Sequence, residues 1–413
     1  MLNFSNYLTE DKGGKNLHLE HIEDEILNYG IVGGRAAINF VQSLRDMLAG
    51  SSRSSVNMTV KWDGAPAIFA GIDPSDGKFF VAKKSVFNVS PKLYKSDAEI
   101  DADVSGNLNS KFKTALSEFS KLGIKGVLQG DLMFTDDVSK TSIDGASYLT
   151  FQPNTIVYAV LEDSDLGTKI RAAKIGVVWH TTYSGKSLPD MKASFGANIS
   201  GLSTPSSVWM DDATYKDVSG SAKMTATETE TVTASLSSAG STFRKINSSL
   251  LTQFLNLQNS FGGNLAGAAL KTYNNSKVRQ GQKITDPKAH AEGYLTWVEN
   301  SFNTQIEKLK TPSRKEDLET KKNETIRELK KHTANLTQII AFQNYIVDAK
   351  MGIVKKLNTV RGIGTFIRTG NGYKVTNPEG YVAIDRISGN AVKLVDRMEF
   401  SFNNFTAVKA WDK

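Results

Sequence analysis

The apolar residues of this chain follow two different periods, which divide it into helical and strand-rich regions. Residues 17–49 carry two stripes at helical spacing, separated by glycines. Residues 56–185 show the alternating and short apolar runs typical of strands, with one amphipathic helix at 108–121. Helical spacing returns over 243–350, and strand patterns return from about residue 363. The pattern predicts an α+β protein in which a helical region separates two strand-rich regions.

Turn signals and local composition place the boundaries between these regions. The stretch Asp73-Pro74-Ser75-Asp76-Gly77 lies between two apolar runs and predicts a tight connection, since proline fixes φ and glycine permits positive φ. Residues 196–242 are rich in Ser, Thr, Ala and Gly, which favours a linker. The predicted division is an N-terminal helical segment at 1–55, the first part of a core at 56–195, a linker at 196–242, an inserted helical domain at 243–358, and the second part of the core at 359–413.

The composition is that of a globular protein, with 39% hydrophobic and 23% charged residues. A chain of 413 residues is longer than one small core needs, so we expect more than one domain. The absence of cysteine excludes disulfides and thiolate metal sites. No apolar run is long enough to span a membrane and the N-terminus does not resemble a signal peptide, so we expect a cytoplasmic protein without a membrane partner. The formal net charge of +7 is compatible with a phosphate-rich partner.

The stretch Lys61-Trp62-Asp63-Gly64 lies between two predicted strands and carries the clearest chemical signal. A lysine amine that has lost its proton can attack the α-phosphate of a nucleoside triphosphate and form a phosphoramidate. Free lysine has a pKa of about 10.4, but desolvation on a strand and neighbouring cations can lower that value. Gly64 would let the backbone approach the nucleotide. The same four residues also describe an ordinary turn, so the motif alone does not decide between the two readings.

Four polar side chains on other predicted strands fit the same chemistry. Asp131 follows a glycine within an apolar run and could hold a ribose hydroxyl or a metal-bound water. Tyr158 lies in an aliphatic strand and could stack on a purine. Glu379 could bind a divalent cation through oxygen. Lys393 is flanked by apolar residues, so it needs an anionic partner or a path to solvent. Each residue also has an ordinary structural explanation, such as an edge-strand position or a core aromatic.

The order of these motifs resembles that of the ATP-dependent ligase and capping-enzyme superfamily, over residues 56–185 and 360–400. The resemblance implies an antiparallel-sheet nucleotidyltransferase core, related to the adenylation domain of ligases, with ATP and Mg²⁺ or Mn²⁺ as cofactors. In that family the first motif supplies the lysine that becomes adenylylated, which corresponds to Lys61. The implied metal ligands are Glu379 and Asp131. The implied nucleotide-binding residues are Val60, Asp63, Gly64, Lys83, Lys84, Asp131, Tyr158 and Lys393.

Several departures from the family pattern favour an RNA-ligase-like enzyme over a DNA ligase. Ala65 and Ala67 stand where DNA ligases usually carry an arginine, Asp131 replaces the usual glutamate, and Val395 replaces a second lysine. Few residues follow position 400, so we do not expect the OB-type domain of DNA ligases and capping enzymes.

The resulting hypothesis is ATP-dependent ligation of single-stranded or nicked nucleic acid, with RNA favoured over DNA, through a covalent lysyl-AMP at Lys61. The helical insert would contact the phosphate backbone through its charge. Two alternatives stay open: nucleotidyl transfer to an acceptor that is not a nucleic acid, and a catalytically inactive structural or assembly protein on the same fold. The whole chain is also similar to an uncharacterised family from tailed phages, which implies the cytoplasm of a host cell.

Overall fold

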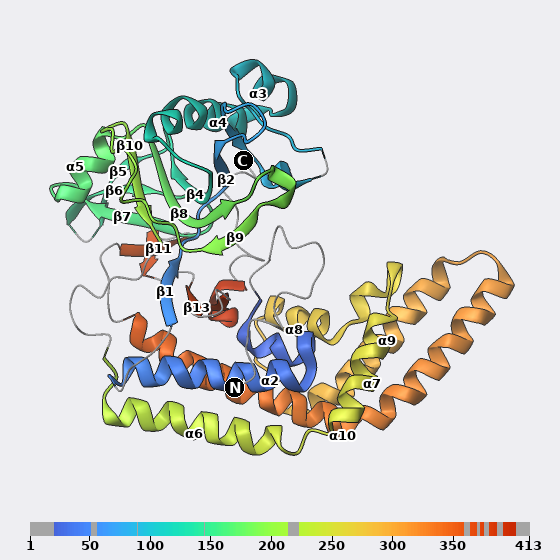
Figure 1. Ribbon diagram of the computed structural model, residues 1–413. Coiled ribbons are helices and arrows are strands. Elements are labelled where there is room, and N and C mark those ends of the chain that lie inside the picture. Colours follow the sequence, from blue (N-terminus) through green and yellow to red (C-terminus); the bar gives the residue numbers. More distant parts are fainter. Residues whose placement is uncertain are drawn as a thin grey trace.

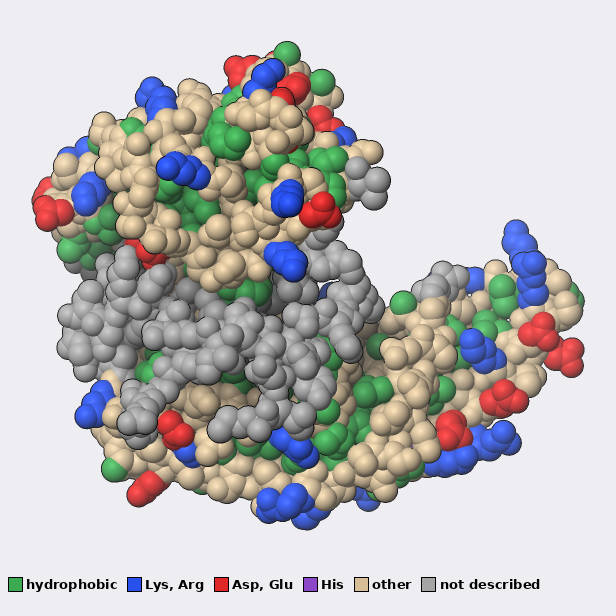
Figure 2. Space-filling view, viewed as in Figure 1, with side chains coloured by type: hydrophobic (Ala, Val, Ile, Leu, Met, Phe, Trp, Pro, Cys, Tyr) green, Lys and Arg blue, Asp and Glu red, His purple; other side chains and the backbone are tan. Residues whose placement is uncertain are grey.

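The computed structural model describes residues 20–50, 56–88, 90–143, 145–213, 223–358, 364–369, 372–375, 380–385 and 391–401. Figure 1 shows an upper body built on sheets and a lower body built from helices, with strands β1 and β13 between them. A long helical arm projects sideways from the lower body and rises to its right, as the space-filling view in Figure 2 also shows. The coarse prediction of an α+β protein is therefore confirmed.

The larger sheet of the upper body has six strands, and it runs antiparallel except that its edge strand β10 is parallel to β8. Helix α3 (Asp97–Asp103) and helix α4 (Gly106–Phe119) cover one face of it. There Phe112 and Phe119 of α4 pack against Leu128, Leu132 and Trp179 of the sheet. The strands, in spatial order, are β10 (Val208–Asp212), β8 (Ile175–Ser184), β4 (Val127–Phe134), β2 (Ala67–Ile72) and β3 (Phe79–Ala82), with β9 (Lys192–Phe195) paired to β8.

A second sheet combines strands from before the helical region, at 139–161, with strands from after it, at 364–375. Its strand β11 (Gly364–Thr369) follows the helical region in sequence, yet it pairs with β7 (Val157–Leu161), so that Thr365 lies opposite Tyr158. In sequence, the helical region thus lies between two strands of one sheet, together with β8, β9 and β10. The other strands are β5 (Ser139–Ile143), β6 (Ala146–Phe151) and β12 (Gly372–Val375), and the short helix α5 (Asp165–Ala172) packs beside β6 and β7.

The third sheet links the two bodies. Strand β1 (Val56–Lys61) pairs with β13 (Gly380–Asp385), which pairs in turn with β14 (Ala391–Leu394), both antiparallel. Val60, Tyr381 and Leu394 lie opposite one another and pack into the hydrophobic core of the helical body. One face of this small sheet is therefore fixed to the helices.

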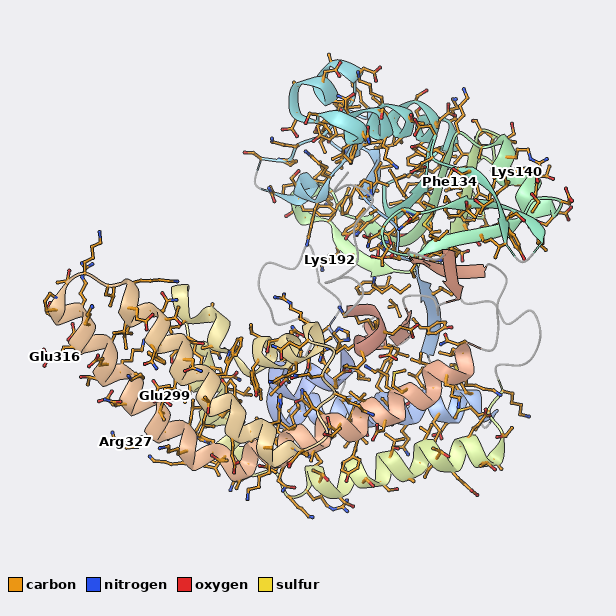
Figure 3. The ribbon with its side chains drawn as sticks, turned by 180° about the vertical axis from the view of Figure 1, so that it is seen from behind. Phe134, Lys140, Lys192, Glu299, Glu316 and Arg327 are labelled. Atoms are coloured by element: carbon orange, nitrogen blue, oxygen red, sulfur yellow. The ribbon has the colours of Figure 1, made fainter. Side chains whose placement is uncertain are left out.

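The helical body has one dominant helix, α10 (Pro312–Leu357), of 46 residues. Its C-terminal half packs against the other helices, whereas none of residues 312–324 is buried and that end forms the arm with α9. Glu316 and Arg327 mark the arm in Figure 3, far from Phe134 in the upper body. No described helix has a stretch apolar and long enough to cross a bilayer. The remaining helices are α2 (Glu25–Leu48), α6 (Ala226–Phe243), α7 (Ser248–Asn259), α8 (Leu270–Arg279) and α9 (Pro287–Lys308), with short helical turns η1 (Ile22–Asp24) and η5 (Gly263–Ala268).

The predicted linker is the main difference between the sequence prediction and the fold. Residues 196–242 include strand β10 and most of helix α6, and α6 packs along α10 and α2. Thr225 caps this helix and exchanges hydrogen bonds with Glu228 in a capping box. The small side chains of α6 allow it to pack closely against its neighbours. The same composition, rich in Ser, Thr, Ala and Gly, is what predicts a linker from sequence. The predicted break within residues 17–49 is present, because Gly30 adopts a φ of 62° and interrupts α2.

A buried cluster of charges joins the N-terminal segment, α10 and the chain after β14. The ammonium of Lys350 donates to both carboxylate oxygens of Glu23, each at 3.0 Å, and both side chains are almost fully buried. Arg397 pairs with Asp24 through two hydrogen bonds, and Gln343 donates to Asp24 at 3.2 Å. Burial alone would raise the pKa of the Glu23 carboxyl, but attraction to Lys350 and Arg397 outweighs burial and holds that pKa below its ordinary value.

This cluster predicts a specific pattern of stability. Lys350→Met leaves Glu23 buried without its partner, so we expect the free energy of unfolding to fall by about 3–5 kcal/mol. The double variant Glu23→Gln with Lys350→Met removes both charges and should recover more than half of that loss. Urea unfolding followed by circular dichroism measures each value, with Lys355→Met, an exposed lysine on the same helix, as the control. Equal stability of the Lys350 and Lys355 variants would contradict the expectation.

Two buried histidines predict a loss of stability in mild acid. Burial lowers the pKa of His290 to about 4. It also lowers the pKa of His332, neither of whose ring nitrogens has a hydrogen-bond partner in the described chain. In the unfolded chain both histidines bind a proton near pH 6.5, whereas in the folded chain they bind it only at lower pH. The free energy of unfolding that they contribute is therefore fully present above about pH 6.5 and is lost as the pH falls toward 4.

His290 alone would account for roughly 3 kcal/mol of this loss at pH 4. His332→Leu removes a titrating group without breaking a hydrogen bond, so we expect it to flatten the decrease. Urea midpoints at about pH 7.5 and 5 measure the effect for wild type and variant. An unchanged pH dependence in the variant would show that His332 does not contribute.

Candidate functional site

The small three-stranded sheet brings together three motifs that are far apart in sequence. Lys61, the last residue of β1, lies directly opposite Gly380 of β13. Lys393 of β14 lies opposite Val382, two residues further along β13. Side chains alternate between the faces of a sheet and paired residues share a face. Lys61 and Lys393 therefore lie on the same face, opposite the one that packs on the helices.

Val60 takes the other face, and this changes its predicted role. Its side chain packs against the helical core, and its backbone N–H donates to the carbonyl of Ala213 at 2.7 Å, which ties β1 to the end of β10. Val60 thus anchors the strand that carries Lys61, and the prediction that it contacts the nucleotide is not supported by its position.

The loop after Lys61 lies directly on strand β4. Ala65 donates its backbone N–H to the carbonyl of Leu132 at 3.0 Å, and Leu132 donates in return to the carbonyl of Pro66 at 3.1 Å. A Cβ built at Gly64 would collide with the Cβ of Asp131 and lie 3.1 Å from the carbonyl oxygen of Leu132. Only glycine permits this approach, so the fourth residue of the motif places Asp131 beside the lysine loop.

His180 is a neighbour of Asp131. Its Nε2 atom lies 3.8 Å from a carboxylate oxygen of Asp131, and its Nδ1 atom is 2.8 Å from the hydroxyl of Thr181. Both His180 and Asp131 are partly exposed. Within the described ranges no group of three or more His, Cys, Asp or Glu side chains could hold a metal ion, so this pair would supply at most two of the ligands of such an ion. The register between β4 and β8 shifts at this point, because Gln129 pairs with Thr181 and Gly130 with Trp179, so an alternating sequence pattern could not place His180 beside Asp131.

Asp63 holds the motif loop in place. Its buried carboxylate accepts hydrogen bonds from the side chain of Asn154 at 2.6 Å and from the backbone N–H groups of Thr155 and Ile156 at 2.7 and 2.8 Å. Its own N–H donates to the Tyr158 hydroxyl at 2.8 Å. Asp63 therefore locks the loop to the start of β7, and its oxygens are engaged by the protein rather than by a nucleotide.

Tyr158 is a core aromatic, which corrects the prediction that it stacks on a purine. Its side chain is only 2% exposed. The ring stacks on Phe151 at a centroid distance of 5.6 Å and packs against Trp62 at 5.3 Å. Trp62 is partly exposed and follows Lys61 directly, so it is the aromatic side chain of the motif loop with surface to offer a base.

The two lysines after β3 have different environments. Lys83 forms an ion pair with Asp103 of α3 at 2.9 Å and lies over the ring of Tyr94. Partial burial would lower the pKa of the Lys83 ammonium, but hydrogen bonds to Asp103 and Tyr94 outweigh burial and raise that pKa. Lys83 thus belongs to the helix-covered face of the sheet and does not lie with Asp131, contrary to prediction. Lys84 is exposed at the start of the turn η2 (Lys84–Phe87).

Glu379 falls outside the described residues, so its predicted metal contact stays a prediction. The adjacent residue, Gly380, is the strand partner of Lys61. The structure thus brings together Lys61, Gly64, Asp131 and Lys393 around the junction of the two bodies, and it adds His180 and Trp62. It moves Val60, Lys83 and Tyr158 into structural roles.

A family model matches residues 16–409 and is described as a family of unknown function, DUF6267. The chain belongs to this family. Searches of curated proteins and of solved structures found no match. The family carries no stated activity, so the chemistry of the site has to be argued from the residues themselves.

The contact between Gly64 and β4 predicts the effect of a single methyl group. Gly64→Ala forces the loop away from Asp131, and we expect it to lower the free energy of unfolding by about 1–3 kcal/mol. Gly201→Ala is the matched control, because a Cβ there meets nothing within 4 Å. The midpoint temperatures of thermal unfolding of the two variants test this expectation. Equal midpoints for Gly64→Ala and Gly201→Ala would contradict it.

Proposed function

We propose that this chain is an ATP-dependent nucleotidyltransferase that forms a covalent lysyl-AMP at Lys61 and joins nucleic-acid ends, with RNA favoured over DNA. The observation that supports this best is the small sheet described above. It places Lys61, Gly380 and Lys393 on adjacent strands, although more than 300 residues separate the first from the others. Such an arrangement is what the proposed chemistry needs and what an ordinary turn at Lys61 does not require.

The first step is the attack of the uncharged Lys61 amine on the α-phosphorus of ATP. A P–N bond forms, the nitrogen loses one proton to solvent, the bond between the α-phosphorus and its bridging oxygen breaks, and pyrophosphate leaves. Lys393, on the same face of the sheet, offers a positive charge to the phosphates as negative charge shifts onto the leaving group. A bound Mg²⁺ or Mn²⁺ would supply further compensation of phosphate charge, and Asp131 would be its described oxygen ligand.

In the second step an oxygen of a 5′-phosphate attacks the phosphorus of the lysyl-AMP. The P–N bond breaks, the amine regains a proton, and the AMP is joined to the strand end. Attack of a 3′-hydroxyl on the 5′-phosphorus then forms the phosphodiester and releases AMP. The arm formed by α9 and the exposed end of α10 carries lysine and arginine side chains interspersed with aspartate and glutamate. We assign it the contact with the strand, through phosphate charge rather than base sequence.

One observation supports the alternative of another acceptor or an inactive site. Val395 stands where ligases usually carry a second lysine, and it is 3% exposed within the core that also contains Met133 and Phe134. The site therefore lacks one cation of the ligase pattern. Transfer to a protein or a small molecule, or loss of the chemistry, is compatible with this difference.

The decisive experiment is incubation of the protein with Mg²⁺ or Mn²⁺ and ATP labelled at the α-phosphate, followed by denaturing electrophoresis. We expect label on the wild type, label at background on Lys61→Ala, and a decrease of about 10²–10³-fold in labelling rate for Lys393→Ala. Lys78→Ala, at an exposed lysine of the loop between β2 and β3, is the matched control and should label like wild type.

The same assay separates the alternatives. Label that moves onto 5′-phosphorylated RNA, and more slowly onto DNA, supports ligation. Label that stays on the protein with either strand supports another acceptor. No label from any of the four nucleoside triphosphates would contradict both enzymatic readings and favour a structural role.

A further inference from the structure

The bulge in strand β8 brings two polar side chains together on the larger sheet of the upper body. His180 is the extra residue of β8 at this bulge, and its Nε2 atom lies 3.8 Å from Oδ1 of Asp131 on β4. The side chain of His180 is 28% exposed and that of Asp131 is 22% exposed, so a ligand can reach both. Gly64 lies against Asp131, so the pair borders the loop that follows Lys61.

The neighbours of the His180 ring determine which nitrogen carries a hydrogen. The Nδ1 atom lies 2.8 Å from the hydroxyl of Thr181, which is able to donate or to accept a hydrogen bond. The Nε2 atom faces the carboxylate of Asp131, which only accepts. A lone pair on Nε2 would be repelled by that carboxylate, so we assign a hydrogen to Nε2, whether or not Nδ1 also carries one. His180 is therefore a donor on the side of Asp131.

The separation of the two groups leaves room for one atom between them. A distance of 3.8 Å is too long for a direct hydrogen bond. It is short enough for a single oxygen atom to lie about 2.8 Å from both Nε2 and Oδ1, the usual length of a hydrogen bond. That oxygen has to accept from His180 and donate to Asp131. The pair thus fits a group that accepts and donates at the same time.

This requirement selects a hydroxyl. A phosphate or carbonyl oxygen only accepts, so Asp131 would repel it, and an ammonium only donates, so it cannot bond to the Nε2–H of His180. A water bound to a metal ion directs a lone pair at the metal and acts as a donor. A hydroxyl has one donor and two acceptor positions, which satisfies both neighbours.

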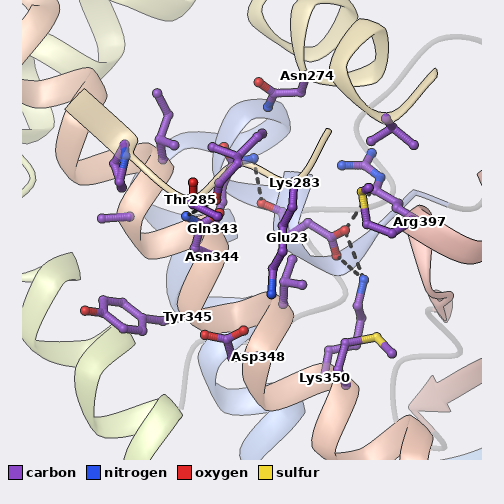
Figure 4. Close-up of a pocket in the computed structure, with 18 of the residues that line it drawn as sticks. Glu23, Asn274, Lys283, Thr285, Gln343, Asn344, Tyr345, Asp348, Lys350 and Arg397 are labelled. Atoms are coloured by element: carbon purple, nitrogen blue, oxygen red, sulfur yellow. Dashed lines mark hydrogen bonds and ion pairs between the residues drawn. The ribbon is translucent and has the colours of Figure 1, made fainter. Parts of the chain in front are cut away.

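The cavity of about 400 Å³ in the helical body offers no comparable selection. Figure 4 shows the ammonium of Lys350 directed at Glu23 at its inner end, and the Lys350 side chain is only 1% exposed. The formal charges of its lining therefore cancel and favour no class of ligand. Three acidic and three basic side chains line it: Glu23, Asp348, Asp396, Lys283, Lys350 and Arg397.

We propose that His180, together with Asp131, binds a ribose hydroxyl of the nucleotide and so determines specificity for ribonucleotides. This proposal rests on the proposed function, in which the α-phosphate of ATP lies at Lys61. The ribose is joined to that phosphate through its 5′-carbon, so it lies close to the loop that the pair borders. The second carboxylate oxygen of Asp131 stays available to a divalent cation. An analogue without the hydroxyl leaves His180 and Asp131 without their bridge, which the site penalises.

Isothermal titration calorimetry with ATP, 2′-deoxy-ATP and 3′-deoxy-ATP tests the proposal. Lys61→Ala serves as the background, because it cannot form a lysyl-AMP and binding is then measured without covalent chemistry. We expect one of the two analogues to bind at least tenfold more weakly than ATP, which identifies the bridging hydroxyl, and the other to bind like ATP. His180→Ala in this background should reduce the tenfold preference to less than about threefold, mainly by weakening the binding of ATP.

Two further variants keep the test specific. His180→Gln retains a side-chain N–H donor and should keep more of the preference than His180→Ala. Lys192→Ala, at an exposed lysine of β9 beside β8, is the matched control and should leave the preference unchanged. Equal affinity for ATP and both analogues, a preference that survives His180→Ala, or a preference seen only with nucleic-acid strands would overturn the proposal.

The outcome is separable from that of the labelling assay. A lysyl-AMP that forms equally well from ATP and from both deoxy analogues would leave the proposed function intact and overturn the role of His180. A ribose preference that depends on His180, in a protein whose Lys61 is never labelled, would contradict the covalent chemistry and support the hydroxyl site.

Discussion

The buried pairing of Glu23 with Lys350 and of Asp24 with Arg397 is the constraint on which the arrangement of the chain depends. Isolated charges cannot remain buried, so each carboxylate needs its cation and each cation its carboxylate. These partners come from the N-terminal segment, from α10 and from the residues after β14. The same segments are joined by the backbone, since the N–H of Lys393 donates to the carbonyl of Glu20 at 3.2 Å. The position of the strand that carries Lys393 is thus set by the charge cluster.

The small sheet of β1, β13 and β14 transmits this constraint to the candidate site. One of its faces is held by the helical core through Tyr381 and Leu394. The other carries Lys61 and Lys393. The loop that follows β1 is fixed to the upper body at Asp63 and Gly64. The lysines therefore lie on the sheet that contacts both bodies.

Features that depend on local pattern could be predicted from the sequence, and features that depend on distant partners could not. The break at Gly30 follows from glycine itself, and the insertion of the helical region follows from the two separated strand patterns. Helix α6 escapes prediction because its buried face consists of Val232, Leu236 and Ala239 among small polar residues. Tyr158 and Lys83 each fit a functional pattern in sequence, but Phe151 and Asp103, which decide their roles, are recognisable only in the fold.

Under the proposed function, two positions depart from the ligase pattern, and both have defined surroundings in the structure. Asp131 is one methylene shorter than glutamate, and Gly64 lets the lysine loop lie directly against it, so the shorter acid is met by a closer loop. Val395 replaces a cation by an apolar side chain that packs into the core of the upper body, while the preceding Leu394 packs into the core of the helical body. Leu394, the last residue of β14, and Val395, which follows it, thus pack into two different hydrophobic cores. The packing of Val395 in the upper body fixes the end of the strand that carries Lys393, two residues before it.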